Sequence, residues 1–277
     1  MGGGGIGKNL IINADDFGLA PGVTRGIVEA HSAGTVTSAS MVVNTPAFPE
    51  AARAARGLPH LSIGLHLNLT AGRPLAPLER VRSLIDAATG RFVSLTRLCW
   101  RAATGRLDPS AVAAEYAAQM GRLAEAGLRA THLDSHRHVH LLPGIRPTIA
   151  REAARAGLPL RTPVEPWPGL GAAAVAKQVA IRCALAAGGA PAPRAPHFRG
   201  MGLYHRPDFR ARLLSLLDRL PDGTTEVVVH PGYVDAELGS WDGYLAPREW
   251  ELAGLLSREV RQRLRGQDPR LVSFPDR

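Results

Sequence analysis

Short apolar runs rich in β-branched residues alternate with longer segments of helical periodicity along almost the whole chain. This alternation predicts parallel strands joined by helices, that is, an α/β fold. The expected strands are residues 9–13, 36–43, 61–66, 130–134 and 225–230, with a weaker one at 159–162. The expected helices are residues 21–33, 48–57, 110–127, 144–157, 207–220 and 247–265. At 277 residues, a (β/α) barrel and a doubly wound open sheet both fit this pattern.

The chain carries no linker and no internal repeat, so we expect a single domain over residues 9–277. Residues 1–8 are rich in glycine and are expected to form a flexible leader. They do not make a dinucleotide-binding loop, because that loop must follow a strand and these glycines precede the first one. Residues 163–206 are dense in Pro and Gly, which predicts loops and one helix over a face of the sheet.

Composition excludes several classes of protein. Cys99 and Cys183 are the only cysteines, so neither a disulfide framework nor a Cys-based zinc site can organise the fold. The net charge is +9, but the arginines are scattered along the chain, which favours a solvated surface over a nucleic-acid footprint. No signal peptide or run of 18 apolar residues occurs, so we expect a cytoplasmic protein without a membrane span. The oligomeric state stays open, with a homodimer as one option.

Polar side chains follow several of the expected strands. Two adjacent carboxylates, Asp15 and Asp16, come after the apolar run of the first strand, and His66 ends the third. His230 follows the Val-rich last strand and precedes a Pro-Gly turn. In parallel α/β folds, catalytic groups gather at the carboxyl ends of strands. One Asp could instead cap the next helix, but two consecutive Asp side chains cannot both do so.

One further strand end is rich in histidine. Asp134, His136, His138 and His140 recur at every second residue. If the backbone stays extended there, the three imidazoles point to one side, which favours a divalent metal site over packing.

These strand ends supply carboxylates and imidazoles but no cysteine. That set suits a metal-activated water better than a covalent nucleophile. The metal would polarise a carbonyl or lower the pKa of bound water, a carboxylate would take the proton, and an imidazole would protonate the leaving group. The residues therefore predict hydrolysis and leave the substrate open.

Four motifs occur in a fixed order, and they also carry a resemblance. They are Asn13-Ala-Asp-Asp-Phe-Gly18, Gly64-Leu-His66 with Leu69-Thr70 and Gly72-Arg-Pro74, Thr131-His-Leu-Asp-Ser-His136-Arg-His138-Val-His140, and His230-Pro-Gly-Tyr233. With these motifs the chain resembles the YdjC-like carbohydrate deacetylase family, from about residue 9 to about residue 256. The resemblance implies a distorted (β/α) TIM-like barrel that removes the acetyl group from an N-acetylated amino sugar with one divalent metal.

The resemblance also implies roles for single residues. The metal ligands would be Asp16, His66 and His136. Asp15 would be the general base acting on water, and His230 the acid that protonates the leaving amine. The remaining imidazoles, those of His138 and His140, would contact substrate or support the ligands, since one ion does not need every histidine.

The metal, the substrate and the class of function each leave an alternative. The family implies Mg²⁺, whereas two imidazoles and a carboxylate suit a transition metal such as Zn²⁺. The natural sugar, free or lipid-linked, stays open because residues 163–206 match no motif. A second reading is another amide or ester hydrolase with a zinc triad of His136, His138 and His140. A third is a non-catalytic protein that binds carbohydrate or metal.

Overall fold

A parallel sheet of seven strands lies at the centre of the described residues, which are 7–166, 170–187, 196–266 and 268–275 of this computed structural model. The strands are β1 (Lys8–Phe17), β2 (Ser38–Met41), β3 (Ser62–Leu67), β4 (Leu133–Ser135), β5 (His197–Arg199), β6 (Gly223–Val229) and β7 (Arg270–Leu271). Their order is β4-β3-β2-β1-β6-β5, and β7 pairs with the start of β1. All of the pairs are parallel.

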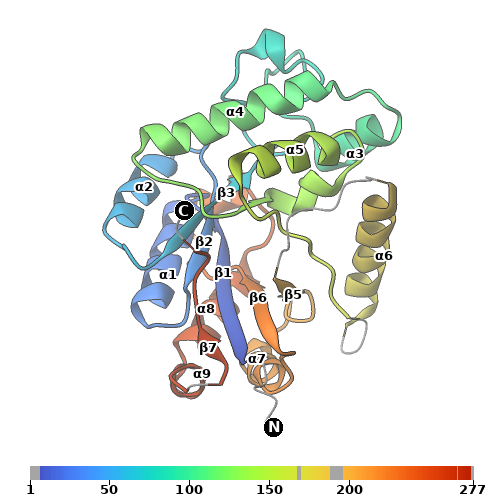
Figure 1. Ribbon diagram of the computed structural model, residues 1–277. Helices are drawn as coiled ribbons and strands as arrows, with labels where there is room; N and C mark the ends of the chain where they lie inside the picture. The colour runs from blue at the N-terminus through green and yellow to red at the C-terminus, as the bar shows by residue number, and fades with distance from the viewer. Residues whose placement is uncertain (1–6, 167–169, 188–195, 267, 276–277) are drawn as a thin grey trace.

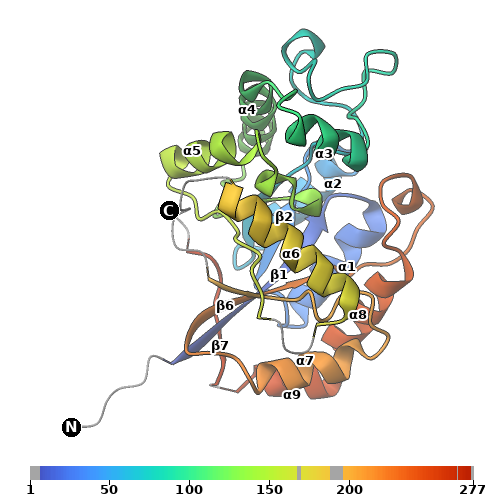
Figure 2. The ribbon, with the colours of Figure 1, turned by 90° about the vertical axis from the view of Figure 1, so that its right-hand side faces the viewer.

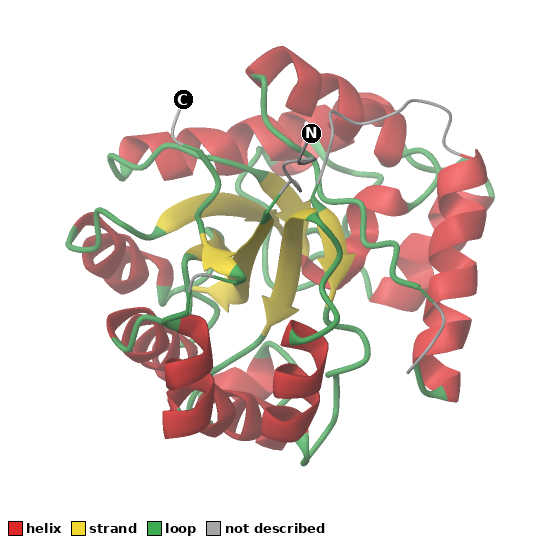
Figure 3. Ribbon diagram, turned by 60° about the horizontal axis from the view of Figure 1, so that its bottom comes forward, coloured by secondary structure: helices red, strands yellow, loops and turns green. Residues whose placement is uncertain are grey.

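The sheet is curled, and helices surround it (Figure 3). Its central strand β1 is buried from Leu10 onward, as expected for a parallel strand covered on both faces. The two edge strands of the described sheet, β4 and β5, do not pair with each other, so the sheet forms a half-barrel. The predicted barrel-like α/β fold is thus confirmed, in the form of a half-barrel.

Nine helices occur in the described residues: α1 (Pro21–Ser32), α2 (Phe48–Arg56), α3 (Leu95–Ala103), α4 (Pro109–Glu125), α5 (Arg146–Ala156), α6 (Ala172–Ala187), α7 (Phe209–Leu217), α8 (Ala246–Leu256) and α9 (Arg258–Leu264). Short 3-10 turns are η1 (Leu78–Arg80), η2 (His136–Leu141) and η3 (Leu238–Ser240). Several helices carry Pro in the first turn, where its missing N–H costs nothing. Helices α1 and α2 lie on the side of the sheet opposite α6 (Figures 1 and 2). None of the described helices has the length and apolarity needed to cross a membrane.

The structure departs from the predicted elements at a few places. The helix expected at 247–265 is two helices, because Ser257 is extended and its hydroxyl caps α9 by accepting the N–H of Val260. The weak strand expected at 159–162 is reduced to one bridge, between Leu160 and Leu133. The segment 163–206 contains the expected helix, α6, and also β5. Of the predicted leader, residues 1–6 lie outside the described residues, and Lys8 already belongs to β1.

Candidate active site

The two carboxylates of β1 lie at a break in the regular strand. The register with β2 shifts between Ala14 and Phe17, and Asp16 has a φ of 70°. Consecutive side chains of a regular strand point to opposite faces, whereas such an irregularity re-aims one of them, and Asp tolerates a left-handed backbone better than most residues. Both carboxylates therefore face His66 on β3. His66 Nε2 lies 3.4 Å from Asp16 Oδ1 and 4.0 Å from Asp15 Oδ2.

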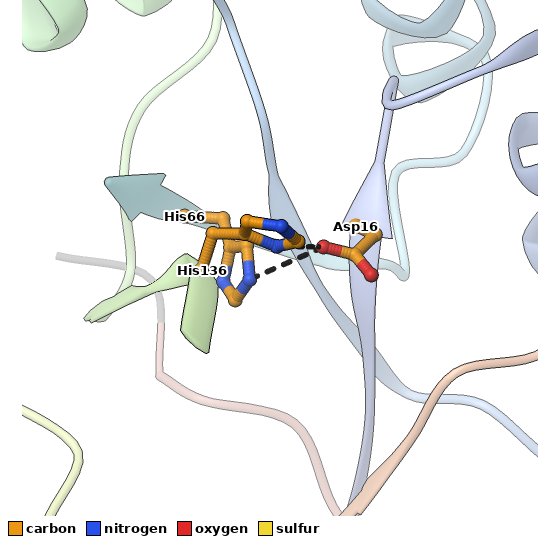
Figure 4. A group of neighbouring side chains, drawn as sticks. All are labelled: Asp16, His66 and His136. Carbon is orange, nitrogen blue, oxygen red and sulfur yellow. Dashed lines mark hydrogen bonds and ion pairs between the residues drawn. The ribbon is translucent and has the colours of Figure 1, made fainter. Parts of the chain in front are cut away.

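Asp16, His66 and His136 form a buried group at the carboxyl ends of β1, β3 and β4. One ligand atom from each lies within 4.8 Å of the others. His136 Nδ1 is 2.8 Å from Asp16 Oδ1, and Figure 4 shows both imidazoles directed at this carboxylate. The structure thus brings together the three residues that the resemblance implied as metal ligands.

The chemistry of this group fits a divalent cation. His136 keeps a buried ring nitrogen, Nε2, that has no hydrogen-bond partner in the described structure. His66 Nδ1 lies 2.7 Å from Asp134 Oδ1, which leaves Nε2 for the site, the usual arrangement of a carboxylate behind a metal-binding imidazole. Burial disfavours the charged His66, but Asp134 and Asp15 outweigh it and raise the pKa of His66 to about 10. The site therefore favours positive charge.

A buried arginine, Arg161, contacts three carboxylates beside the site. Arg161 contacts both oxygens of Asp15, at 2.7 and 2.8 Å. Its Nη2 also lies 2.6 Å from Asp134 Oδ2 and 2.8 Å from Glu226 Oε1. A second acidic group, Asp15, His66 and Asp134, also has ligand spacing, but Arg161 already supplies a cation to both of its carboxylates. Of the two groups, the one with Asp16 is therefore the better candidate for a metal ion.

A second buried arginine, Arg248, occupies one of the two carboxylate oxygens of Asp16. Arg248 on α8 donates to Asp16 Oδ2 at 2.6 Å and to Asp242 Oδ2 at 2.8 Å. Burial opposes ionisation of Asp16, but the charges of His136 and Arg248 prevail and hold the pKa of Asp16 well below its usual range. Asp16 is therefore a carboxylate that faces the two imidazoles through one oxygen, Oδ1.

His230 stands at the end of β6, where a close approach of two backbones fixes the turn. A Cβ at Gly26 of α1 would lie 2.7 Å from the Cα of Gly232, so the Pro-Gly turn after His230 packs directly on α1. His230 Nε2 lies 3.9 Å from Asp15 Oδ2. Burial lowers the pKa of His230 to about 4, although Asp15 and Asp16 oppose the change. The imidazole is therefore neutral near pH 7 and can accept a proton from its neighbours.

The three alternate histidines do not share one side, because the chain does not stay extended. It leaves β4 at Ser135, and Arg137 and His138 have φ values of 60° and 56°. His138 lines the cavity next to the site, with a buried Nδ1 that lacks a partner in the described structure. His140 is fully buried and turned away, since its ring nitrogens contact Ser135 Oγ and the carbonyl of Arg161. The geometry supports neither the zinc triad nor a substrate contact for His140.

A cavity of about 690 Å³ opens beside these residues. Residues of η2, β5 and the first half of α6 line it, and α6 lies in front of the sheet in Figure 2. Its wall includes Asp15, Asp16, His66, His136, His138, Lys177, Tyr204 and His230. The volume is within the usual range of small-molecule sites.

Sequence reasoning assigned no role in the site to Arg161, Glu226 or Arg248. One signal was present: Glu226 directly precedes the three valines of β6, and a carboxylate inside a buried strand needs a buried partner. Arg161 lies within the weak strand expected at 159–162, without any comparable mark in the sequence. The contacts of Arg248 and Glu251 depend on how α8 packs, which the sequence pattern does not show.

The chain is similar to known proteins over almost its whole length. The family model described as YdjC-like protein matches residues 9–266. A carbohydrate deacetylase of Geobacillus stearothermophilus is 36% identical over 268 residues, covering 96% of this chain and 97% of that protein. A chitooligosaccharide deacetylase of Yersinia enterocolitica is 34% identical, covering 97% and 99%. The crystal structure of an Enterococcus faecalis protein, provisionally described as a cellobiose-phosphate cleavage protein, superposes with a TM-score of 0.77 at 30% identity, covering 97% and 98%.

Proposed function

This chain belongs to the YdjC-like protein family, and from that premise we propose that it is a metal-dependent carbohydrate deacetylase. Its substrate would be an N-acetylated amino sugar, free or lipid-linked. The observation that carries the proposal is the meeting of Asp16, His66 and His136 with Asp15 and His230 at the wall of one cavity. The relatives named as deacetylases match the chain over almost their whole length, which supports the same reaction class.

Asp16, His66 and His136 would hold the ion, for which we propose Mg²⁺, with Zn²⁺ as the alternative that their donor atoms favour. A bound divalent ion would polarise the acetyl carbonyl and make water a stronger nucleophile. Asp15 takes the proton of the attacking water, while Arg161 fixes both of its oxygens. As the C–N bond breaks, the amine needs a proton, and His230 is placed to deliver it. His230 Nε2 is 3.9 Å from Asp15 Oδ2, which is longer than a hydrogen bond, so the proton taken from water would reach His230 through one bridging water and then pass to the amine.

The test is acetate release from N-acetylglucosamine oligomers by the purified protein, with and without a chelator, together with metal analysis. We expect release that the chelator abolishes and that the bound metal restores. The variant Asp15→Asn should keep the metal and lose most turnover, by about 100-fold or more for a lost general base. Normal turnover in that variant would end the assignment of Asp15, and a protein that binds metal but deacetylates no acetylated sugar would refute the proposed function.

A further inference from the structure

Glu251 is a buried carboxylate to which the proposed chemistry gives no direct part. It lies on α8 and is 3% exposed. Its Oε2 accepts the peptide N–H of His230 at 2.5 Å, and its Oε1 accepts the hydroxyl of Tyr244. Burial raises the pKa of Glu251 to about 7, although these hydrogen bonds oppose the change. Burying a carboxyl group costs free energy, which indicates that Glu251 acts on a neighbouring group.

That neighbour is the imidazole of His230. In the described part of the chain, Glu251 forms an ion pair with His230, in which Glu251 Oε1 lies 4.0 Å from His230 Nδ1. The other ring nitrogen, Nε2, faces Asp15 at 3.9 Å. The ring therefore stands between two carboxylates, one near each nitrogen. Neither distance is that of a hydrogen bond, so Glu251 acts on the ring through its charge, which stabilises the cationic form, and on the position of His230 through the peptide N–H that it accepts.

Tyr244 holds this carboxylate in place. Its hydroxyl donates to Glu251 Oε1, and its ring stacks on Tyr204 with centroids 4.2 Å apart and planes at 9°. Both rings also contact the imidazole of His230 edge-on, with centroids 5.3 Å away for Tyr244 and 5.5 Å for Tyr204. The hydroxyl donor, the stacked rings and the peptide N–H of His230 leave the Glu251 carboxylate little freedom to move.

We propose that Glu251 is a positioning residue that holds His230 with Nε2 toward Asp15 and stabilises the imidazolium during proton delivery to the leaving amine. The inference rests on the proposed deacetylase function. In that reaction water forms the new C–O bond and the amide C–N bond breaks. The proton passes from water to Asp15, then to His230 Nε2 and then to the amine nitrogen. Glu251 itself forms no bond to the reacting atoms and takes no part in this proton relay.

The variant Glu251→Gln removes the charge and keeps a side chain of the same shape that can still accept a hydrogen bond. We expect kcat for acetate release from N-acetylglucosamine oligomers to fall about 10- to 100-fold, a part of the ~10²–10⁴ that a general acid supplies. KM and the bound metal should not change. Glu249→Gln is the matched control, because Glu249 lies on the same helix and is exposed. Its carboxylate accepts the backbone N–H of Val234 at 3.3 Å.

A second substrate separates positioning from a structural role. In 4-nitrophenyl acetate the leaving nitrophenolate departs as an anion and needs no proton, so a group that acts through His230 should matter little. We therefore expect Glu251→Gln to reduce amide cleavage and to spare ester cleavage. In a His230→Ala background, Glu251→Gln should cause no additional loss of amide cleavage, because the two residues act as one unit.

Each outcome decides the inference. Equal losses on amide and ester, or no loss on either, would overturn the positioning role while leaving the proposed function intact. A wild-type protein that cleaves neither substrate would overturn the proposed function, and the inference with it. If Glu251→Gln does not fold, Tyr244→Phe takes its place: it keeps the stacked ring, frees the Glu251 carboxylate, and should give a smaller loss with the same preference for the amide.

Discussion

Replacing the buried Arg161 by Met should destabilise the protein far more than replacing an exposed arginine. Arg161 is 1% exposed and contacts Asp15, Asp134 and Glu226, all of them at most 3% exposed. Methionine keeps an apolar stem of similar length but leaves three carboxylates in the interior without their cation. Arg151→Met is the matched control, since the Arg151 side chain is 58% exposed and only approaches Glu152.

The expected loss can be worked out in two ways. Removing one partner of a buried ion pair costs about 3–5 kcal/mol. Alternatively, one uncompensated carboxylate takes up a proton, and protonating a group of ordinary pKa near 4 costs about 4 kcal/mol at pH 7, at about 1.4 kcal/mol per pH unit. The two estimates agree at about 4 kcal/mol. An exposed pair such as that of Arg151 contributes at most about 1 kcal/mol.

The second estimate also gives the sign of a pH effect. In the Arg161→Met variant a carboxyl group has a folded-state pKa above its unfolded value. The cost of burying this group is therefore absent at low pH, and the folded protein loses stability as the pH rises. The deficit relative to wild type should therefore shrink from about 4 kcal/mol at pH 7 to about 1–2 kcal/mol at pH 5. Adding Glu226→Gln should recover part of the loss, because it removes one of the stranded charges.

The assay is urea unfolding followed by circular dichroism, with chelator present so that metal binding does not add to the folded state. Three results would contradict this role of Arg161. They are a loss of unfolding free energy below about 1 kcal/mol at pH 7, a loss that is the same at pH 5 and pH 7, or a double variant that is less stable than Arg161→Met alone. Any of these would mean that Arg161 does not compensate these carboxylates.

Three further predictions concern the ligands, the buried histidines and the packing of β3. His66→Ala should purify without stoichiometric metal but with native circular dichroism; full metal content would remove His66 from the ligand set. Burial lowers the pKa of His140 to about 4, below its unfolded value, so its contribution to stability is lost as the pH falls from about 6.5 toward 4. Urea midpoints between pH 7 and pH 4.5 should fall for wild type and fall less steeply for His140→Gln. Gly64→Ala would place a Cβ against the ring of His132 and should destabilise the protein by about 1–3 kcal/mol. Gly121→Ala adds a Cβ in open space within α4 and should stabilise the protein by about 0.5–1 kcal/mol. Equal effects of the two variants in thermal unfolding would contradict this packing.

The sequence predicts that polar side chains meet at one edge of the sheet because parallel strands bring their carboxyl ends there, whereas the choice of Asp16, His66 and His136 as ligands is implied by the resemblance. All three lie at or just after the end of a strand, so strand order brings them together, and the irregular backbone at Asp16 aims its carboxylate. The alternate spacing of His138 and His140 misleads, because it assumes an extended chain where the backbone instead turns with positive φ. Such a turn is selected by tertiary contacts, such as the bond of His140 to the carbonyl of Arg161, which no local pattern contains.

Charges that come from distant segments were the hardest to predict, and they explain why this site favours a cation. Four buried carboxylates, those of Asp15, Asp16, Asp134 and Glu226, surround two buried guanidinium groups, those of Arg161 and Arg248. The two arginines cannot balance all four charges, and the raised pKa values of His66, about 10, and Glu226, about 7, show that protons make up part of the difference. The proposed divalent ion would supply two positive charges where, in the described network, two imidazoles face Asp16 Oδ1, the oxygen that Arg248 does not contact. Arg161 would therefore direct the proposed ion to Asp16, because this arginine already pairs with Asp15 and Asp134 on the other side of His66.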